Sequence, residues 1–564
     1  MYDTLTEKQH EIVFEKSGKF VVRACPGSGK TYCVSARLSR LINSWDKNYQ
    51  GIACLSFTNV AWQEIEKKYK EVFNTNYNIS YPHFLGTIDS FINKYIFLAY
   101  GHLVLKCKNR PVLVGEPHGI WTGRFFSDSF FDNLTFNIDG EIYALNPRLM
   151  PNNWNSNSQI ISSKNRLIKC GYANQSDANY FAIKILEKYP QIAKSIALRF
   201  PIIIIDEAQD TSEIQMKIID LLIANGLNEI MLVGDPDQAI FEWNDARPDL
   251  LIEKFNAWPN SIILNENRRS SQNICNYTHK ISSLSEPSIS VNEEIKEFHF
   301  RPKVITYTTA NLREIVNLFV QECVANGIEE NEQNISILYR SKGLINEITG
   351  VTEIPFNTKV WSQHSSYTKD FAKGKYLYDR GQFKNGFKLI EKAIVKIFNN
   401  LSHCREEDIE NIIKKMGFIN FRTAVFDFIN LLPETNIAIG DWVTQVNANF
   451  VAENIEKKLQ IENAGKRLTF QQLFLNEYDK TSPFNYRLGT VHSAKGETFD
   501  ATLLILKSKG VGQAYKTILK NNISITDSEE LRIAYVGMTR PRKILVLAVP
   551  DDTNKAAWES KFNL

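Results

Sequence analysis

The sequence predicts an α/β protein with two parallel-sheet cores, each interrupted by a long and largely helical insertion. Three observations lead to this prediction. Short continuous apolar runs alternate with helical patterns, which is typical of parallel strands covered on both faces. These runs fall into two groups along the 564-residue chain, on either side of a Ser- and Glu-rich stretch at 282–297. Each group is broken by a region without such runs, at 92–174 and at 366–485.

The first group of apolar runs supplies the strands of the first core. Residues 19–23 lead into a glycine-rich loop, and the apolar spacing of Val34, Leu38 and Leu41 after it predicts a helix. Residues 59–73 predict a charged amphipathic helix that Asn59 caps. The other predicted strands of this core are 51–57, 201–206, 229–235 and 261–264.

The second group of apolar runs predicts strands at 303–306, 335–339, 488–491, 501–506 and 543–549. The insertion at 366–485 is mostly helical in pattern, as in residues 387–398. The first insertion holds an Asn- and Ser-rich stretch at 151–158, which predicts a loop. We therefore expect a first core of residues 1–91 and 175–281 with 92–174 inserted, and a second of 282–365 and 486–564 with 366–485 inserted.

Composition excludes several classes of protein. The apolar share of 43% and the net charge of +3, from 66 basic and 63 acidic residues, argue against disorder. So small a net charge does not indicate a polyanion partner, but a local basic groove would suffice for one. The N-terminus lacks the order of a signal peptide, and no apolar run approaches the roughly 20 residues of a membrane span. We expect a cytoplasmic protein without membrane contact.

The glycine-rich loop Ala24-Cys-Pro-Gly-Ser-Gly-Lys-Thr31 lies between a predicted strand and a predicted helix. Glycines in such a loop let backbone N–H groups surround a phosphate at the helix N-terminus. Lys30 would reach the β- and γ-phosphates, and Thr31 would hold Mg²⁺. The predicted ATP-binding residues of the loop are Ala24, Gly27, Ser28, Gly29, Lys30 and Thr31.

Acidic and amide side chains follow two later strands of the same core. Asp206 stands at a strand end and can hold Mg²⁺, while Glu207 can deprotonate the attacking water. Gln238 follows the next strand and could sense the γ-phosphate. Arg269 and Arg540 are candidate arginine fingers, although a lone arginine is more often a surface or ion-pair residue. The predicted site hydrolyses a nucleoside triphosphate.

Taken in order, these and further motifs resemble those of the UvrD/Rep/PcrA group of superfamily 1 helicases. The resemblance spans residues 5–549. Its motifs lie at 5–9, 24–31, 57–59, 86–91, 205–211, 234–243, 267–270, 335–341, 490–496 and 529–540.

The resemblance implies two RecA-like cores with ATP and Mg²⁺ between them, each carrying one insertion. It implies that Gln9 reads adenine and that Arg37 lies beside the base. It also implies that Gln238 couples the ATP site to the DNA groove, and that Arg269 and Arg540 are arginine fingers. The implied contacts to single-stranded DNA are Phe57, Thr58, Asn59, Thr87, Trp243, Thr490 and His492.

Several positions depart from the family pattern. Arg268 replaces the tyrosine that stacks on adenine, and Asp89 replaces a histidine. Asn244 and Asp245 follow Trp243 where the family has Arg-Gly, which removes a positive charge from the DNA side and adds a negative one. Thr498 takes the position of a glutamate that contacts ribose, so Glu497 is displaced by one place.

The resemblance favours an ATP-driven, Mg²⁺-dependent translocase on single-stranded DNA that moves 3′ to 5′ and unwinds duplex. The chain also resembles the small UvrD-like subunits of bacterial anti-phage systems, such as the helicase-like subunit of Gabija, which implies a partner nuclease. The alternative is a regulatory subunit that senses ATP and DNA ends and switches a partner nuclease with little unwinding. A small-molecule kinase has no use for a second core carrying His492 and Arg540.

Overall fold

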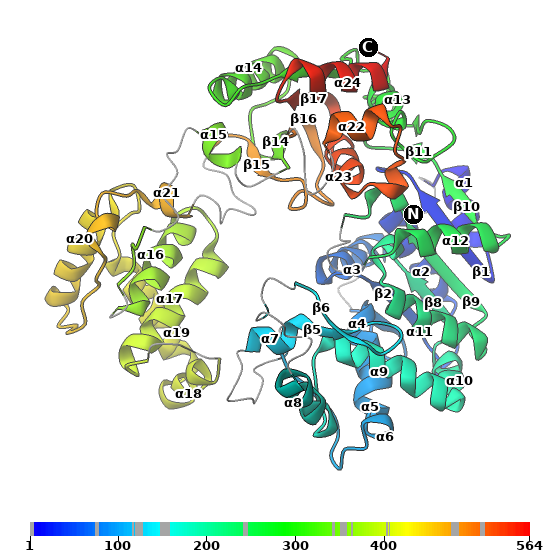
Figure 1. Cartoon of the computed structure of the whole chain (residues 1–564), viewed down its shortest axis with the longest axis horizontal. Coiled ribbons are helices and arrows are strands. Elements are labelled where there is room, and N and C mark those ends of the chain that lie inside the picture. The colour runs from blue at the N-terminus through cyan, green and yellow to red at the C-terminus, as the bar shows by residue number, and fades with distance from the viewer. Residues whose placement is uncertain are drawn as a thin grey trace. The chain divides into compact units, whose positions relative to one another are not determined.

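The computed structural model describes residues 5–73, 78–115, 118, 128–146, 150, 158–240, 246–340, 344–349, 358–362, 365–401, 404, 406–474, 484–507 and 514–563. The chain divides into two compact units (Figure 1). Unit 1 is Met1–Phe298 with Ile523–Thr539, and unit 2 is His299–Asn522 with Arg540–Leu564. Residues 523–539 thus cluster with unit 1, whereas the sequence analysis groups them with the second core. The predicted domain boundaries stay predictions.

The described part of unit 1 contains a six-stranded parallel sheet in the order β10-β1-β9-β8-β2-β3. All five strands predicted for the first core are confirmed, and β3 is an edge strand that the sequence analysis did not predict. Continuous apolar runs such as Ile202–Ile205 form the central strands because both faces of this sheet are covered. The strands are β1 (Lys19–Ala24), β2 (Ile52–Ser56), β3 (Phe84–Thr87), β8 (Ile202–Ile205), β9 (Glu229–Gly234) and β10 (Ile262–Leu264).

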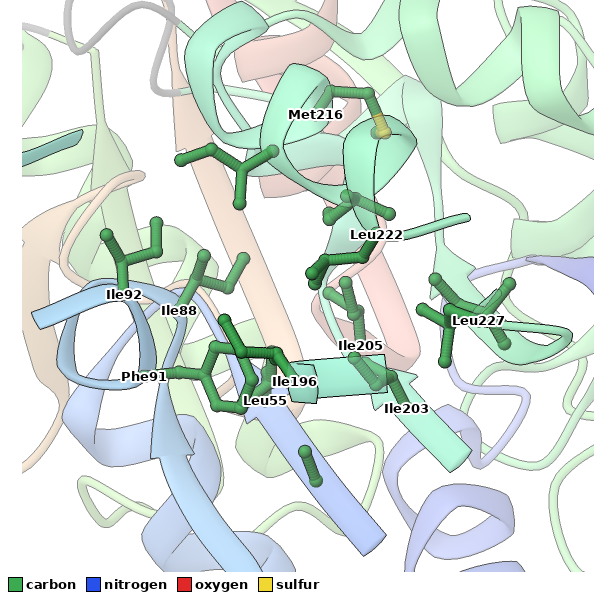
Figure 2. Packing of buried hydrophobic residues seen from close by; sticks show 14 of the residues in the cluster. Leu55, Ile88, Phe91, Ile92, Ile196, Ile203, Ile205, Met216, Leu222 and Leu227 are labelled. Atoms are coloured by element: carbon green, nitrogen blue, oxygen red, sulfur yellow. The ribbon is translucent and has the colours of Figure 1, made fainter. Parts of the chain in front are cut away.

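Apolar clusters bury both faces of the unit 1 sheet. On one face, Leu55, Ile203 and Ile205 pack against Phe91, Ile196, Met216 and Leu222 from helices (Figure 2). On the other, strand residues such as Val22 and Cys54 pack against Val34 and Leu38 of the predicted post-loop helix. The main helices are α2 (Lys30–Asn43), α3 (Asn59–Phe73), α4 (Ile88–Ile92), α9 (Gln175–Lys188), α10 (Pro190–Arg199), α11 (Glu213–Ala224), α12 (Pro248–Ala257) and α13 (Gln272–His279).

The insertion in unit 1 mixes short helices with two small sheets, so it is less helical than predicted. Strands β5 and β6 pair antiparallel, and β4 and β7 pair parallel. The loop predicted at 151–158 lies mostly outside the described residues. The elements are α5 (Leu98–Tyr100), α6 (His102–Leu105), β4 (Val112–Leu113), α7 (Asp128–Asn133), β5 (Leu134–Phe136), β6 (Ile142–Ala144), α8 (Ser158–Lys169) and β7 (Tyr172–Ala173).

A buried ion pair joins α8 to the start of α9. Lys164 Nζ lies 2.8 Å from Asp177 Oδ2, and both side chains are 0% exposed. Lys164 also donates to the carbonyls of Phe131 and Leu134, at 3.3 and 3.2 Å. Asp177 completes a capping box with Asn174 at the start of α9. The pair therefore ties two segments of the insertion, α8 and the stretch from Phe131 to Leu134, to the start of α9.

Replacing Lys164 by methionine is expected to lower the local unfolding free energy of this insertion by about 3 to 5 kcal/mol, because it leaves the Asp177 charge buried without its cation. Hydrogen exchange of the amides near Phe131 and Leu134 would measure the change. The control is Lys184→Met on α9, since Lys184 is partly exposed and its pair with Glu187 is a surface one. If Lys164→Met lowers the local unfolding free energy no more than the control does, the buried ion pair does not stabilise the insertion.

The described part of unit 2 contains a five-stranded parallel sheet in the order β13-β17-β16-β14-β15. All five strands predicted for the second core are confirmed. The strands are β13 (Lys303–Thr306), β14 (Ile335–Tyr339), β15 (Arg487–Thr490), β16 (Phe499–Ile505) and β17 (Pro541–Val549).

Helices account for most of the remainder of unit 2, as the pattern at 366–485 predicts. An aromatic core that includes Phe371, Phe428 and Phe450 packs the insertion helices together. Among the described residues, no helix is long and apolar enough to span a bilayer. The helices are α14 (Leu312–Ala325), α15 (Ile345–Thr349), α16 (Ser366–Asp379), α17 (Phe383–Phe398), α18 (Glu406–Met416), α19 (Phe418–Leu431), α20 (Ile439–Ala452), α21 (Phe470–Phe474), α22 (Tyr515–Lys520) and α24 (Asp552–Phe562).

Candidate functional site

The glycine-rich loop connects β1 to α2 at the carboxyl end of the unit 1 sheet. Gly27 and Gly29 both have left-handed backbone, with φ of 74° and 77°. Gly29 is the N-cap of α2, so the loop delivers Lys30 and Thr31 to the first turn of that helix. Ser28 Oγ is buried and has no hydrogen-bond partner among the described residues. A loop of this shape, with an unpaired hydroxyl and a helix N-terminus, fits an anion such as a phosphate.

The loop packs against the turn at 267–269. The Arg268 backbone N–H donates to the Gly27 carbonyl at 2.9 Å. A Cβ at position 27 would lie 2.6 Å from both Arg269 Cβ and Asn267 Oδ1, which leaves no room for a side chain.

Replacing Gly27 by alanine is expected to weaken nucleotide binding at least about tenfold, because left-handed backbone costs an alanine roughly 1–2 kcal/mol and its Cβ also collides with the neighbouring turn. Binding of a fluorescent ATP analogue would measure the loss. Gly18→Ala is a matched control, since Gly18 has the same φ of 74° but its Cβ would meet nothing closer than 3.8 Å. Affinity within twofold of the wild type for Gly27→Ala would show that the loop does not hold the nucleotide.

Four predicted catalytic and metal-binding groups converge at this loop. Lys30 Nζ lies 3.5 Å from Glu207 Oε1, and Thr31 Oγ1 donates to Asp206 Oδ2 at 3.3 Å. Glu207 has left-handed backbone at φ 53°, an unusual conformation for a non-glycine residue, directly after β8. Burial, followed by the neighbouring Glu207 carboxylate, raises the pKa of Asp206 to about 7, which Lys30 opposes.

Thr31 and Asp206 together offer the hard oxygen ligands that Mg²⁺ prefers. The pKa of Asp206 is raised because burial and the charge of Glu207 disfavour its ionised form more than the single cation Lys30 favours it. A bound cation would supply further positive charge, so the residues present fit Mg²⁺ beside a phosphate.

A buried amide network joins β8 to β9 below the loop. Gln209 Nε2 donates to a Glu207 carboxylate oxygen, and its Oε1 accepts from the Asp235 backbone N–H at 3.1 Å. The Gln238 side chain is 5% exposed and donates to Asp235 Oδ2. Burial, followed by Asp237, raises the pKa of Asp235 to about 7, and Lys30 lowers it. Gln238 therefore lies in the same electrostatic network as Lys30.

The structure holds Gln9 against the loop. Thr6 caps the short helix α1 (Glu7–His10) in a capping box with Gln9, and Gln9 Nε2 donates to the Ser28 carbonyl at 2.9 Å. Gln9 Oε1 accepts from the Thr6 N–H at 3.1 Å and from Arg268 at 3.3 Å. Arg268, which departs from the family pattern, thus contacts the predicted adenine-reading residue directly.

Arg37 is 4% exposed and bonds to backbone. It donates to the carbonyls of Ile12 and Lys16 at 2.6 and 2.8 Å, at the two ends of the π-helix η1 (Glu11–Glu15). Its guanidinium lies 5.1 Å from the Phe20 ring centre. In the structure Arg37 therefore supports the segment that carries Gln9, and its predicted contact to the nucleotide stays a prediction.

The helix α23 (Glu529–Met538) packs within unit 1. Arg269 donates to the Thr539 carbonyl at its C-terminal end, at 3.1 Å. The Arg532 side chain is 1% exposed and donates to the carbonyls of Ala239, Ile525 and Thr526 at 2.7 to 2.8 Å. Arg532 therefore connects α23 to the residue after Gln238. In unit 2, Arg540 is also 1% exposed and donates to the Glu497 carbonyl at 3.4 Å.

The predicted DNA contacts of unit 1 surround the end of β2 and the start of α4. Thr58 and Asn59 are exposed, and Asn59 Oδ1 accepts from Trp62 at 3.1 Å. Thr87 caps α4 by accepting from the Ser90 N–H at 3.1 Å, so it has a structural role as well. Trp243, Asn244 and Asp245 lie outside the described residues.

Phe57 lines a groove of about 1000 Å³ together with residues of the insertion. Asp89 lies in this groove and accepts from Asn179 and Gln215 at 3.0 and 2.8 Å. Arg247, which also lines the groove, pairs with Asp249 at 2.7 Å and with Glu213 at 3.3 Å. The lining acids are Asp89, Asp139, Glu213, Asp249 and Asp527. The charge of this groove is therefore unfavourable for a phosphate backbone.

The predicted DNA contacts of unit 2 follow β15. Thr490 Oγ1 accepts from the Ser493 N–H at 3.2 Å, and His492 is half-buried. The displaced Glu497 pairs with Arg487, whose Nε lies 3.1 Å from Glu497 Oε2. Its carboxylate thus has a partner within unit 2.

The sequence did not identify the residues whose buried hydrogen bonds position the segments that carry the site. Gln209 and Arg532 are two examples. A third is Asp237, which accepts from Ser282 Oγ at 2.7 Å and from the Ser283 N–H at 2.8 Å, at the start of the segment that leads to unit 2. A buried polar residue beside a motif is the only sequence signal for such roles.

Comparisons with known proteins agree with the order of the motifs. Residues 5–118 and 144–258 match the family model of the UvrD/REP helicase N-terminal domain. Residues 442–551 match the UvrD-like helicase C-terminal domain. The two matches together cover more than half of the chain.

Full-length relatives are similar at low identity. The chain is 23% identical to DNA helicase II of Haemophilus influenzae, over 100% of this chain and 86% of that protein. It is 23% identical to the Gabija protein GajB of Bacillus cereus over 88% of each. It is 22% identical to a probable DNA helicase II homolog of Mycoplasma capricolum, over 85% of this chain and 66% of that protein. With both helicase domains matched in the predicted order, the chain belongs to the UvrD-like helicase family.

Proposed function

We propose that the chain is an ATP-driven, Mg²⁺-dependent translocase on single-stranded DNA. The observation that carries the proposal is the convergence of Lys30, Thr31, Asp206 and Glu207 at one loop. Lys30 neutralises charge on the transferred phosphoryl group, and Thr31 with Asp206 holds the metal. Glu207 accepts the proton of the attacking water. These are the parts that phosphoryl transfer to water needs.

The remaining predicted residues have supporting roles in this proposal. Gln9 contacts the adenine, Arg37 supports the segment that carries Gln9, and Arg268 lies beside Gln9. Gln238, bonded to Asp235, couples the γ-phosphate to the rest of unit 1. Arg269 and Arg540 act as fingers between two RecA-like cores. Phe57, Thr58, Asn59, Thr87, Trp243, Thr490 and His492 contact the DNA, which moves 3′ to 5′ as in the family.

The similarity to GajB supports a role in bacterial anti-phage defence with a partner nuclease. In that setting the protein works in the cytoplasm on DNA that has a single-stranded end. Co-purification from the native host would test the partner directly.

A second function is favoured by the acidic groove at Phe57. Because Asp89 and its acidic neighbours repel phosphates, unit 1 would bind DNA weakly and report ATP and DNA ends to a partner nuclease with little unwinding. A strand-displacement assay with the isolated chain separates the two proposals. Processive unwinding without a partner favours the translocase, and DNA-stimulated ATP hydrolysis without unwinding favours the sensor.

A further inference from the structure

Unit 2 carries a groove of about 1010 Å³ lined by residues of α22 and α24, two helices that are labelled in Figure 1. Three lysines line it: Lys516 and Lys520 from α22, and Lys561 from α24. Among the described residues that line it, none is acidic, and the other polar ones carry hydroxyl or amide side chains, such as Thr553, Ser560 and Asn521.

A packed aromatic layer holds the two helices that form the groove. Tyr515 lies against Trp558 with ring centres 5.7 Å apart, and Trp558 stacks on Phe562 at 5.4 Å. All three side chains are buried, so the facing surfaces of α22 and α24 are fixed relative to each other. Lys516 and Lys520 are four residues apart on one helix, which places them on the same face, about 5–6 Å apart at Cβ.

In the described part of unit 2, the lysines of the groove have few polar partners, one of which is Asn522, whose Oδ1 accepts from Lys561 at 3.4 Å. None of the three forms an ion pair with a residue in the part of the chain that the structure describes, whereas Lys555, which does not line the groove, pairs with Glu559 at 3.7 Å. Besides the hydrogen bond from Thr553, the positive charge of Lys516 acts on the carboxylate of Asp551 and helps to lower its pKa. The same carboxylate caps α24 by accepting from Thr553 at 2.6 Å and from the Asn554 N–H at 2.8 Å.

We propose that this groove binds the phosphodiester backbone of DNA, as a site additional to the predicted track at Thr490 and His492. The inference rests on the proposed function in assuming a DNA substrate. Phosphate oxygens only accept hydrogen bonds, and the lining residues that the structure describes offer ammonium, hydroxyl and amide donors without a carboxylate. An acidic protein segment would also need apolar surface to bury, and the groove offers only one leucine and two alanines.

The test compares the full chain with the triple variant Lys516→Gln, Lys520→Gln, Lys561→Gln. The affinity for a single-stranded oligonucleotide is measured between 50 and 200 mM salt. Losing three phosphate contacts should lower the slope of log affinity against log salt by about 2, so that the loss of affinity over this range becomes about 16-fold smaller. ATP hydrolysis without DNA should be unchanged.

The matched control is Lys414→Gln, Lys415→Gln, Lys458→Gln, which removes three exposed lysines from the same unit without touching the groove. Its slope should equal that of the wild type. If the triple groove variant has the wild-type salt slope, the inference is overturned. Binding of polyglutamate, a model of an acidic protein segment, is measured for the same variants. If the groove variant loses polyglutamate binding while its DNA slope is unchanged, the inference is also overturned, and the ligand is an acidic protein. A wild type that binds no DNA would instead overturn the proposed function.

Discussion

Replacing Lys30 by alanine is expected to lower the rate of ATP hydrolysis at least about 100-fold, since one preorganised charge on a transferring phosphoryl group is worth roughly 10²–10³ in rate. Lys30 Nζ lies 3.5 Å from the Glu207 carboxylate, and Lys30 opposes the raised pKa values of both Asp206 and Asp235. Removing Lys30 takes away a positive charge that stabilises the bound phosphates and the carboxylates of Asp206 and Asp235. A coupled phosphate-release assay at saturating ATP measures the effect.

The control for this variant is Lys184→Ala on α9, which removes a partly exposed lysine that pairs with Glu187 on the same helix. It should hydrolyse ATP at the wild-type rate. Equal rates for Lys30→Ala and the wild type would mean that the loop is not the catalytic site.

Replacing Glu207 by glutamine is expected to lower ATP hydrolysis by about 10²- to 10⁴-fold while ATP still binds, because the amide keeps the size of the side chain but cannot accept the proton of the attacking water. This separates the two variants: Lys30→Ala should weaken nucleotide binding, and Glu207→Gln should not. Single-turnover hydrolysis combined with binding of a fluorescent ATP analogue would measure both quantities.

Glu187→Gln on α9 is the isosteric control, since Glu187 is exposed and distant in sequence from every motif. A Glu207→Gln enzyme that turns over ATP at more than about a tenth of the wild-type rate would require a different base. Gln209, which donates to the Glu207 carboxylate, would then lose its assigned role in positioning that base.

Much of the fold follows from the pattern of apolar runs. Ile202–Ile205 and Ile335–Tyr339 are strands because runs this apolar are stable only where both faces are buried. The edge strand β3 (Phe84–Thr87) escaped prediction because it is short, contains Gly86 and is only partly buried, so its pattern is weak. The β-structure of the first insertion was missed for the same reason.

The candidate site is predictable where chemistry restricts the residue type. Gly27 and Gly29 need left-handed backbone, and Lys30, Thr31, Asp206 and Glu207 converge because their strands and helix share one sheet edge. The sequence does not predict which other residues pack against or hydrogen-bond to the segments that carry the site. Arg532 reaches Ala239 from 293 positions away, a contact that depends on the tertiary fold alone.

The charge distribution is likewise a property of the fold. A net charge of +3 conceals an acidic groove at Phe57 in unit 1 and a basic groove between α22 and α24 in unit 2. Local fields of this kind, more than the total charge, decide where a polyanion binds.

The most direct test of the account is the rate of ATP hydrolysis by the purified wild-type chain with and without single-stranded DNA, in the presence of Mg²⁺. The hydrolysis rate of the wild type should rise with added DNA to a saturating value, and hydrolysis should disappear in Lys30→Ala. A rate that is the same with and without DNA would contradict the central claim that ATP hydrolysis at this loop is coupled to a DNA strand.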